Sequence, residues 1–255
     1  MRALILAGSR PGALDPVATY AGVPHKALIE LDGETLLTRV ARALWKADIE
    51  PFVSADYPAV VAEAERLGLH VIEPAAGPSG SVAVGLETLG APLLVTTADH
   101  ALLDADWVRR FVADTPADAD VAVLLARRDV VEAAAPGTKR TYLRFQDGDW
   151  SGCNLFLLRT PRAAAAIGLW SAVEADRKRP WRIVRRLGPA LLSRYLVGRL
   201  TLTEALGHLG EQAGVTVAAV ASPFGLAAVD VDKPADLDLV RRLIDQKIAT
   251  ALSDR

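Results

Sequence analysis

The stretch Ala3-Leu4-Ile5-Leu6-Ala7 runs directly into Gly8-Ser9-Arg10-Pro11-Gly12, and a loop then leads to Lys26. The apolar residues predict a short strand that is buried on both faces. Glycine lets backbone N–H groups approach a phosphate, and an arginine and a lysine neutralise its charge. The spacing matches neither a Walker loop nor the Gly-x-Gly-x-x-Gly fingerprint. A phosphate-binding loop and an ordinary strand-to-loop turn therefore both stay open.

Strand-like and helix-like segments alternate through the first half of the chain. Because parallel strands need crossover connections, this alternation predicts a mainly parallel sheet with helices on both faces, a Rossmann-like α/β fold. Strand patterns cover 3–7, 51–54, 70–72, 93–97 and 121–126, and helix patterns cover 35–47, 59–67, 80–89 and 105–113.

The pattern changes after residue 128. No later stretch has the composition of a linker, so we expect one domain over residues 1–255 with a helical, basic insertion at about 161–210. The other elements expected in this half are a loop at 129–140, strands at 142–145 and 154–158 around a turn at 147–149, strands at 215–220 and 227–231, and a closing helix at 235–251.

Composition excludes several classes of protein. The net charge of −2 argues against binding of nucleic acid by bulk electrostatics, so no nucleic-acid partner is expected. The single cysteine, Cys153, excludes an internal disulfide and a zinc site made of several cysteines. No apolar run reaches about 18 residues and no leader pattern opens the sequence, so a cytoplasmic location is expected.

Asp99 follows the strand pattern 93–97 after one alanine. Ligands of an open parallel sheet bind at the carboxyl ends of its strands, so this position suits a functional carboxylate. A helix cap is the alternative role, but Asp104 is better placed to cap the next helix. The sequence therefore favours Asp99 as a ligand of a hard cation such as Mg²⁺.

Asp230 and Asp232 lie at the end of the strand pattern 227–231. We expect their side chains to point to opposite faces of an extended segment, so that only one faces the pocket squarely. In the alternative interpretation, residues 232–236 are simply a helix start with a proline in the first turn. Two carboxylates from distant segments beside a phosphate loop would bind Mg²⁺ together with a nucleoside triphosphate.

Three further features are candidates for substrate contacts. The glycine turn at 77–82 contains Gly80 and Ser81, which could contact a base or cap a helix. Asn154 begins an apolar strand and could contact an acceptor or a neighbouring loop. The basic run with Lys178 and Arg182 fits a solvated helix face, a site for an acceptor phosphate or a peripheral contact with anionic lipid.

Taken together, these motifs resemble the MobA-like nucleotidyltransferases of the GT-A-like nucleotide-diphospho-sugar transferase superfamily. The resemblance rests on six stretches: Leu6-Ala7-Gly8-Ser9-Arg10, Lys26-Ala27-Leu28, Gly33-Glu34-Thr35-Leu36-Leu37, Thr97-Ala98-Asp99, Gly152-Cys153-Asn154 and Asp230-Val231-Asp232-Lys233-Pro234-Ala235-Asp236-Leu237. It implies a GT-A-like fold. It also implies a nucleotide site at Leu6, Ala7, Gly8, Ser9, Arg10 and Lys26, with the 77–82 turn against the base, and Mg²⁺ on Asp99 and Asp232.

The sequence departs from this family in its single glycine at Gly8, in Pro11 and in its long 161–210 segment, which favours a different acceptor. The pair Ser81-Val82 resembles a helix start of cytidylyltransferases and favours CTP, with GTP as the other candidate.

The expected reaction is attack by a phosphorylated small-molecule, sugar or lipid-like acceptor on the α-phosphorus of the triphosphate, with release of pyrophosphate. Arg10, Lys26, Asp99 and Asp232 are the expected catalytic residues, and Asn154, Lys178 and Arg182 would hold the acceptor.

Two other functions stay open. A nucleotide-sugar-dependent glycosyltransferase would use a related sheet, but it normally carries Asp-x-Asp where this chain has Ala98-Asp99-His100. A non-catalytic nucleotide-binding module would fit the irregular first loop.

Overall fold

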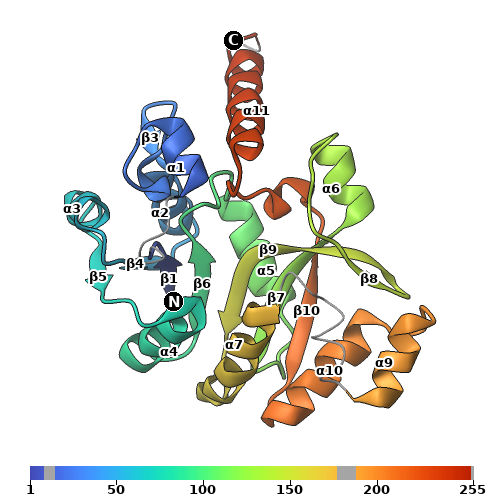
Figure 1. The fold of residues 1–255 in the computed structure, drawn as a ribbon. Coiled ribbons are helices and arrows are strands. Elements are labelled where there is room, and N and C mark those ends of the chain that lie inside the picture. The colour runs from blue at the N-terminus through green and yellow to red at the C-terminus, as the bar shows by residue number, and fades with distance from the viewer. Residues whose placement is uncertain (9–14, 177–187, 254–255) are drawn as a thin grey trace.

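The fold is organised around one mixed β-sheet (Figure 1). The computed structural model describes residues 1–8, 15–176 and 188–253. In spatial order the sheet contains β10 (Val217–Ser222), β7 (Val121–Arg127), β9 (Gly148–Leu158), β6 (Leu93–Thr97), β1 (Arg2–Leu6), β4 (Glu50–Ser54) and β5 (His70–Ile72), with β8 (Leu143–Phe145) paired to β9. Neighbouring strands are parallel except at β9, which is antiparallel to β6, β7 and β8. The predicted mainly parallel α/β fold is confirmed.

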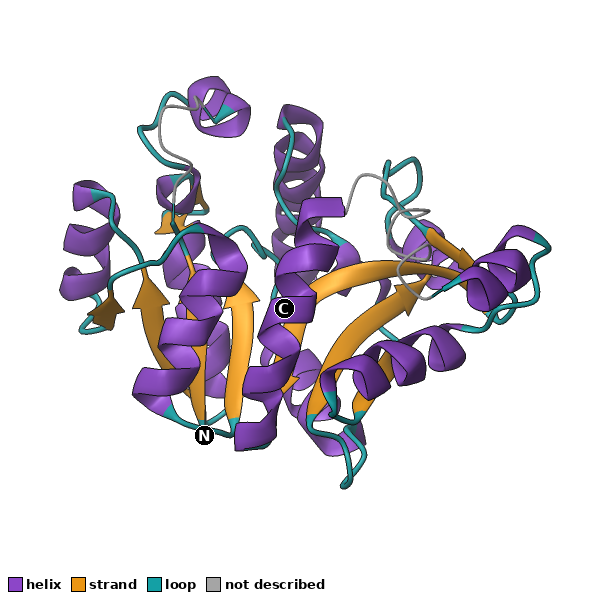
Figure 2. Cartoon of the chain, turned by 60° about the horizontal axis from the view of Figure 1, so that its bottom comes forward, coloured by secondary structure: helices purple, strands orange, loops and turns teal. Residues whose placement is uncertain are grey.

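Helices pack on both faces of the sheet, as Figure 2 shows. The helices are α1 (Pro16–Ala21), α2 (Leu36–Lys46), α3 (Pro58–Arg66), α4 (Gly77–Leu89), α5 (Ala105–Asp114), α6 (Arg128–Ala134), α7 (Ala166–Asp176), α9 (Pro189–Leu196), α10 (Leu202–Ala213) and α11 (Pro234–Ser253). Short 3-10 turns are η1 (Lys26–Leu28), η2 (Pro161–Ala165) and η3 (Gly225–Ala228), and β2 (Glu30–Leu31) pairs with β3 (Glu34–Thr35).

The alternation of side chains along β1 divides the core into two layers. Ala3 and Ile5 belong to the larger core cluster, which includes residues of α2 and α5, whereas Leu4 packs with α4 on the other face. Helix α4 lies so close to β1 that a Cβ on Gly85 would come within 2.5 Å of Leu4. Each fully buried Leu or Ile side chain contributes about 1.5–3 kcal/mol, so these layers hold the strand ends in fixed positions.

Four expectations for secondary structure were wrong. The segment before Lys26 contains α1, which Asp15 caps through Val17 N and Ala18 N. Residues 128–134 form α6 rather than a loop, and the helix buries Val131. Strand β9 begins at the turn, at Gly148, rather than at Asn154. The expected strand at 227–231 is absent, and the 3-10 turn η3 precedes Asp230.

The predicted 161–210 insertion contains η2, α7, α9 and the start of α10, and its residues 177–187 lie outside the described part of the chain. Helix α10 lies beside β10, at the end of the sheet away from β5, and α9 lies next to α10 (Figure 1). Leu200, Ala205 and Leu209 form a small separate core there. Within the described residues, no helix has both the length and the apolar character needed to cross a membrane.

Candidate active site

The carboxyl ends of β1 and β6 lie side by side and bring two of the predicted segments together. The strands pair in parallel register up to Leu6 and Thr97, and Ala98 N then donates to Leu6 O at 3.0 Å. Asp99 therefore leaves the sheet beside the carboxyl end of β1. This places the candidate carboxylate where an open α/β sheet binds its ligands.

Asp99 is only 5% exposed, and its two oxygens differ. Oδ2 accepts a hydrogen bond from Lys26 Nζ, whereas Oδ1 is buried without a hydrogen-bond partner among the described residues. Burial acts to raise the pKa of Asp99, but the Lys26 ammonium outweighs it and holds that pKa below its ordinary value. Asp99 is therefore a charged, buried carboxylate, and its Oδ1 makes no hydrogen bond of normal geometry to the part of the chain that the structure describes.

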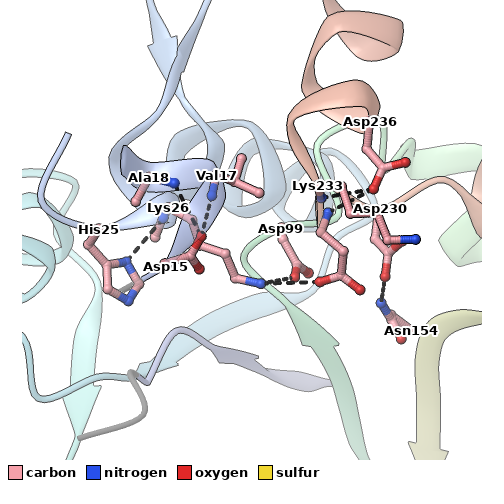
Figure 3. A network of polar contacts seen from close by, with 12 residues as sticks. Asp15, Val17, Ala18, His25, Lys26, Asp99, Asn154, Asp230, Lys233 and Asp236 are labelled. Atoms are coloured by element: carbon pink, nitrogen blue, oxygen red, sulfur yellow. Dashed lines mark hydrogen bonds and ion pairs between the residues drawn. The ribbon is translucent and has the colours of Figure 1, made fainter. Parts of the chain in front are cut away.

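Lys26 comes from η1 and links two carboxylates (Figure 3). Besides its bond to Asp99, its Nζ lies 3.5 Å from Asp232 Oδ1. Burial acts to lower the pKa of Lys26, but Asp99 and Asp232 reverse this and raise it above its ordinary value. The turn is held by His25, whose Nδ1 accepts from Ala27 N at 3.1 Å and whose ring stacks on Tyr57. Lys26 is thus a fixed cation at this edge of the sheet.

Asp230 and Asp232 both join Asp99, and the expectation that they face opposite sides was wrong. One oxygen from each of the three carboxylates lies within 4.8 Å of the other two. Side chains two positions apart in an extended segment share a face, which the sequence interpretation overlooked. Val231 N donates to Asp99 O at 3.0 Å and holds the two segments together.

Asp230 differs from Asp99 because both of its oxygens are bonded. Arg140 Nη1 donates to Oδ1, and Asn154 Nδ2 donates to Oδ2 at 2.8 Å. Asn154 has a φ of 48° at an irregularity in the pairing of β7 with β9, and asparagine tolerates that backbone conformation better than most residues. Burial, then the charges of Asp99 and Asp232, raise the pKa of Asp230 to about 6.

The remaining predicted nucleotide residues are only partly described. Leu6 ends β1 and Ala7 follows it, and Gly8 is exposed with room for a Cβ, so close packing does not require a glycine there. Ser9 and Arg10 lie outside the described residues. Their contact with a triphosphate stays a prediction.

The 77–82 turn is the first part of α4, which begins at Gly77 rather than at Gly80. Ser81 is buried, and its Oγ donates to Gly77 O at 3.1 Å and accepts from Ala75 N at 3.2 Å. These bonds favour the structural interpretation of Ser81. Gly80 lies close to Ala75 and is partly buried, so contact of Gly80 and Ser81 with a base stays a prediction.

The predicted acceptor residues have separate positions. Asn154 lies at the carboxylate cluster through its bond to Asp230 (Figure 3). Lys178 and Arg182 lie outside the described residues, so the three interpretations of that basic run stay open.

Two residues of the site were missed or misjudged. Asp230 was left out of the metal ligands, although its spacing from Asp232 was sufficient to place both on one face. Arg140 was assigned to a loop, and nothing in the sequence links it to Asp230, which is 90 residues away. The packing of α6 and η3 against each other brings their segments close: a Cβ on Gly225 would lie 2.1 Å from Val130 O.

The donor set fits a divalent cation with a preference for oxygen. Mg²⁺ is usually bound by one or two carboxylates together with substrate phosphates. The orphaned Asp99 Oδ1 is such a donor, and Asp232, whose side chain is 58% exposed, is a second one that faces solvent. Three clustered carboxylates repel one another, and a cation relieves that repulsion.

Comparison with known proteins identifies the family. The family model of the MobA-like NTP transferase domain matches residues 3–146, more than half of the chain. The chain belongs to this family. MobA-like NTP transferases are nucleotidyltransferases, and the predicted recognition and enzyme class are thereby confirmed. A search of curated proteins found no match.

Solved structures extend the similarity of this MobA-like chain beyond residue 146. A hypothetical transferase from Thermus thermophilus is 30% identical, with a TM-score of 0.78, over 92% of this chain and 98% of that one. The CMP:2-keto-3-deoxy-manno-octonic acid synthetase solved with CTP is 19% identical, with a TM-score of 0.57, over 97% and 100%. The 4-diphosphocytidyl-2C-methyl-D-erythritol synthase of Anaerococcus prevotii is 10% identical, with a TM-score of 0.56, over 96% and 95%. The last two likenesses concern the fold alone.

Proposed function

We propose that this MobA-like transferase moves a nucleoside monophosphate from a nucleoside triphosphate to a phosphorylated acceptor, with Mg²⁺ as cofactor and pyrophosphate as the other product. The observation that carries the proposal is the cluster of Asp99, Asp230 and Asp232 beside Lys26 at the carboxyl edge of the sheet. Mg²⁺ bound there would neutralise charge on the phosphate oxygens of the triphosphate.

The protein's own contribution is positioning and charge. An acceptor phosphate is already ionised near pH 7, so its oxygen needs no strong general base. Lys26 keeps its charge because its pKa is raised, and it offers further N–H donors to a phosphate chain. Arg10 is proposed to act on the same phosphates from the loop after β1. Such preorganised charge is a major source of rate enhancement in phosphoryl transfer.

The nucleotide is proposed to be CTP or GTP. CTP comes first because the sequence Ser81-Val82 favours it and because a protein of the same fold has been solved with CTP. The acceptor is proposed to be a phosphate monoester of a small alcohol, a sugar or a lipid-like molecule. Asn154, Lys178 and Arg182 are its proposed contacts.

The test has two stages. A thermal-shift screen of CTP, GTP, ATP and UTP with Mg²⁺ identifies the nucleotide, because a ligand that binds only the folded state raises its melting temperature. Pyrophosphate release is then measured with that nucleotide and a panel of phosphate monoesters. Release that needs both substrates and Mg²⁺ supports the proposal.

The same assay separates the alternatives. A glycosyltransferase would turn over nucleotide sugars without net pyrophosphate release. A non-catalytic module would give the thermal shift but no product with any acceptor. Either result would replace the proposed function.

A further inference from the structure

Arg140 lies outside the predicted machinery, yet it contacts two acidic residues at the site. Its side chain is 7% exposed. Nη1 donates to Asp230 Oδ1, while Nη2 donates to Asp230 O at 3.1 Å and to Asp236 Oδ1 at 2.8 Å. A guanidinium presents its donors in a planar fork of fixed shape. One side chain therefore sets the separation of the Asp230 and Asp236 carboxylates.

Further hydrogen bonds fix the backbone between these two acids. Asp236 Oδ2 accepts from Asp232 N at 3.2 Å and from Lys233 N at 2.9 Å. Val231 N donates to Asp99 O at 3.0 Å. The Asp232 side chain is thus 58% exposed but stands on a backbone that is held on both sides.

The three carboxylates of the cluster are consequently not equivalent. Among the described residues, Asp99 Oδ1 has no hydrogen-bond partner, and Asp232 is open to solvent. Both oxygens of Asp230 accept hydrogen bonds, one from Arg140 and one from Asn154. Asp230 is suited to transmit the position of Arg140 to its neighbours, while Asp99 and Asp232 are suited to meet a ligand.

We infer that Arg140 is a positioning residue for the divalent-cation site: its fork holds Asp230 and Asp236 and thereby aims Asp232 at Asp99. The inference rests on the proposed function, since it requires a cation at these two carboxylates. Outer partners of this kind typically change metal affinity by about 10- to 100-fold when they are removed.

Charge and geometry make opposite predictions at this position, which makes the inference testable. A positive charge beside a cation site opposes cation binding, so removal of charge alone tightens binding. Loss of the Arg140 guanidinium removes the hydrogen bonds that hold residues 230–236 in place, and this weakens cation binding. Arg140→Lys keeps the charge but replaces the planar fork with a single nitrogen, whereas Arg140→Met loses both the charge and the fork.

The experiment is a titration of the full-length chain with Mn²⁺ alone, followed by the electron paramagnetic resonance signal of free Mn²⁺. We expect Arg140→Lys and Arg140→Met each to weaken binding about tenfold, with circular dichroism unchanged. The matched controls are Arg144→Lys and Arg144→Met, at an exposed position of β8, and both should bind as the wild type does.

Wild-type affinity in Arg140→Lys together with tighter binding in Arg140→Met overturns the inference, because Arg140 would then act by charge. If these variants do not fold, Asp236→Asn provides the readout. It keeps the size of the side chain and the Arg140 bond to Asp230, but it weakens the other end of the fork. Several-fold weaker binding supports the inference, and unchanged binding overturns it. A wild type that binds no Mn²⁺, or binds it equally well after Asp99→Asn, overturns the proposed cation site itself.

Discussion

Two buried aspartates, Asp120 and Asp99, lie at opposite ends of the strands of one sheet and differ in their hydrogen bonds and neighbouring charges. Asp120 precedes β7, and its carboxylate accepts from Thr160 Oγ1 at 2.6 Å and from Thr216 N at 2.9 Å, with Arg162 at 3.8 Å. Asp99 follows β6, keeps one oxygen without a partner among the described residues and lies among other carboxylates. Both oxygens of Asp120 accept hydrogen bonds within the fold, whereas only one oxygen of Asp99 does so among the described residues.

This difference indicates which of the two does chemistry. A buried carboxylate with hydrogen bonds to both oxygens stabilises the connection it lies in. A buried carboxylate that has an unbonded oxygen and lies beside like charges lowers the stability of the fold, unless a bound cation or hydrogen-bond donor pairs with that oxygen. We therefore expect changes at Asp99 to affect turnover and changes at Asp120 to affect folding.

The largest expected effect is that of Asp99→Asn on turnover. The substitution keeps the size of the side chain but removes the charge that faces Lys26. We expect pyrophosphate release to fall by about 10³-fold, the loss typical of a preorganised electrostatic group. Circular dichroism should show a folded protein.

Asp118→Asn, on the exposed turn before β7, is the matched control and should keep full activity. Retained turnover in folded Asp99→Asn protein would contradict a catalytic role of the Asp99 carboxylate.

A second expected effect concerns acid sensitivity next to Asp99. Burial lowers the pKa of His100 to about 4, although the Asp99 charge opposes this. Because the unfolded chain takes up a proton near pH 6.5 and the folded chain near pH 4, stability is complete above pH 6.5 and is lost as the pH falls between these values. The loss from this ring should be about 3 kcal/mol.

Chemical unfolding of the wild type and His100→Gln at pH 7 and pH 4.5, with chelator present, measures this loss. The variant should lose less stability on acidification than the wild type. Equal losses in the two proteins would show that His100 is not held neutral by burial.

The smallest of these effects is expected at Asp120. Asp120→Ala leaves Thr160 Oγ1 and Thr216 N without their acceptor, and should lower the free energy of unfolding by about 2 kcal/mol. Mn²⁺ binding should stay at the wild-type level. Asp118→Ala is the matched control for denaturant unfolding. A loss of Mn²⁺ affinity in folded Asp120→Ala would contradict the assignment of a structural role to Asp120 and a ligand-binding role to Asp99.

The sequence was sufficient for features that local periodicity decides. The apolar runs of β1 and β6 and the stripe of α2 predicted a parallel sheet, and the position of Asp99 after β6 followed from it. Asp104 was expected to cap the next helix, and its Oδ1 accepts from Asp106 N at 2.9 Å. Each of these features depends on residues close together in the chain.

Contacts between distant segments could not be predicted in this way. Residues 227–231 have a strand composition, but η3 forms there because Gly225 packs against the backbone of α6. That packing places Arg140 on Asp230, and no local pattern contains it. The carboxylate cluster was therefore predicted in its parts, and its arrangement is a property of the tertiary structure.

The most direct measurement is the anomalous scattering of Mn²⁺ in crystals grown with Mn²⁺ and the nucleotide selected by thermal shift. The account predicts a peak between the Asp99 and Asp232 carboxylates, within about 2.5 Å of an oxygen of each and of a phosphate oxygen. A bound nucleotide with no peak there, or with Mn²⁺ bound away from both aspartates, would contradict it.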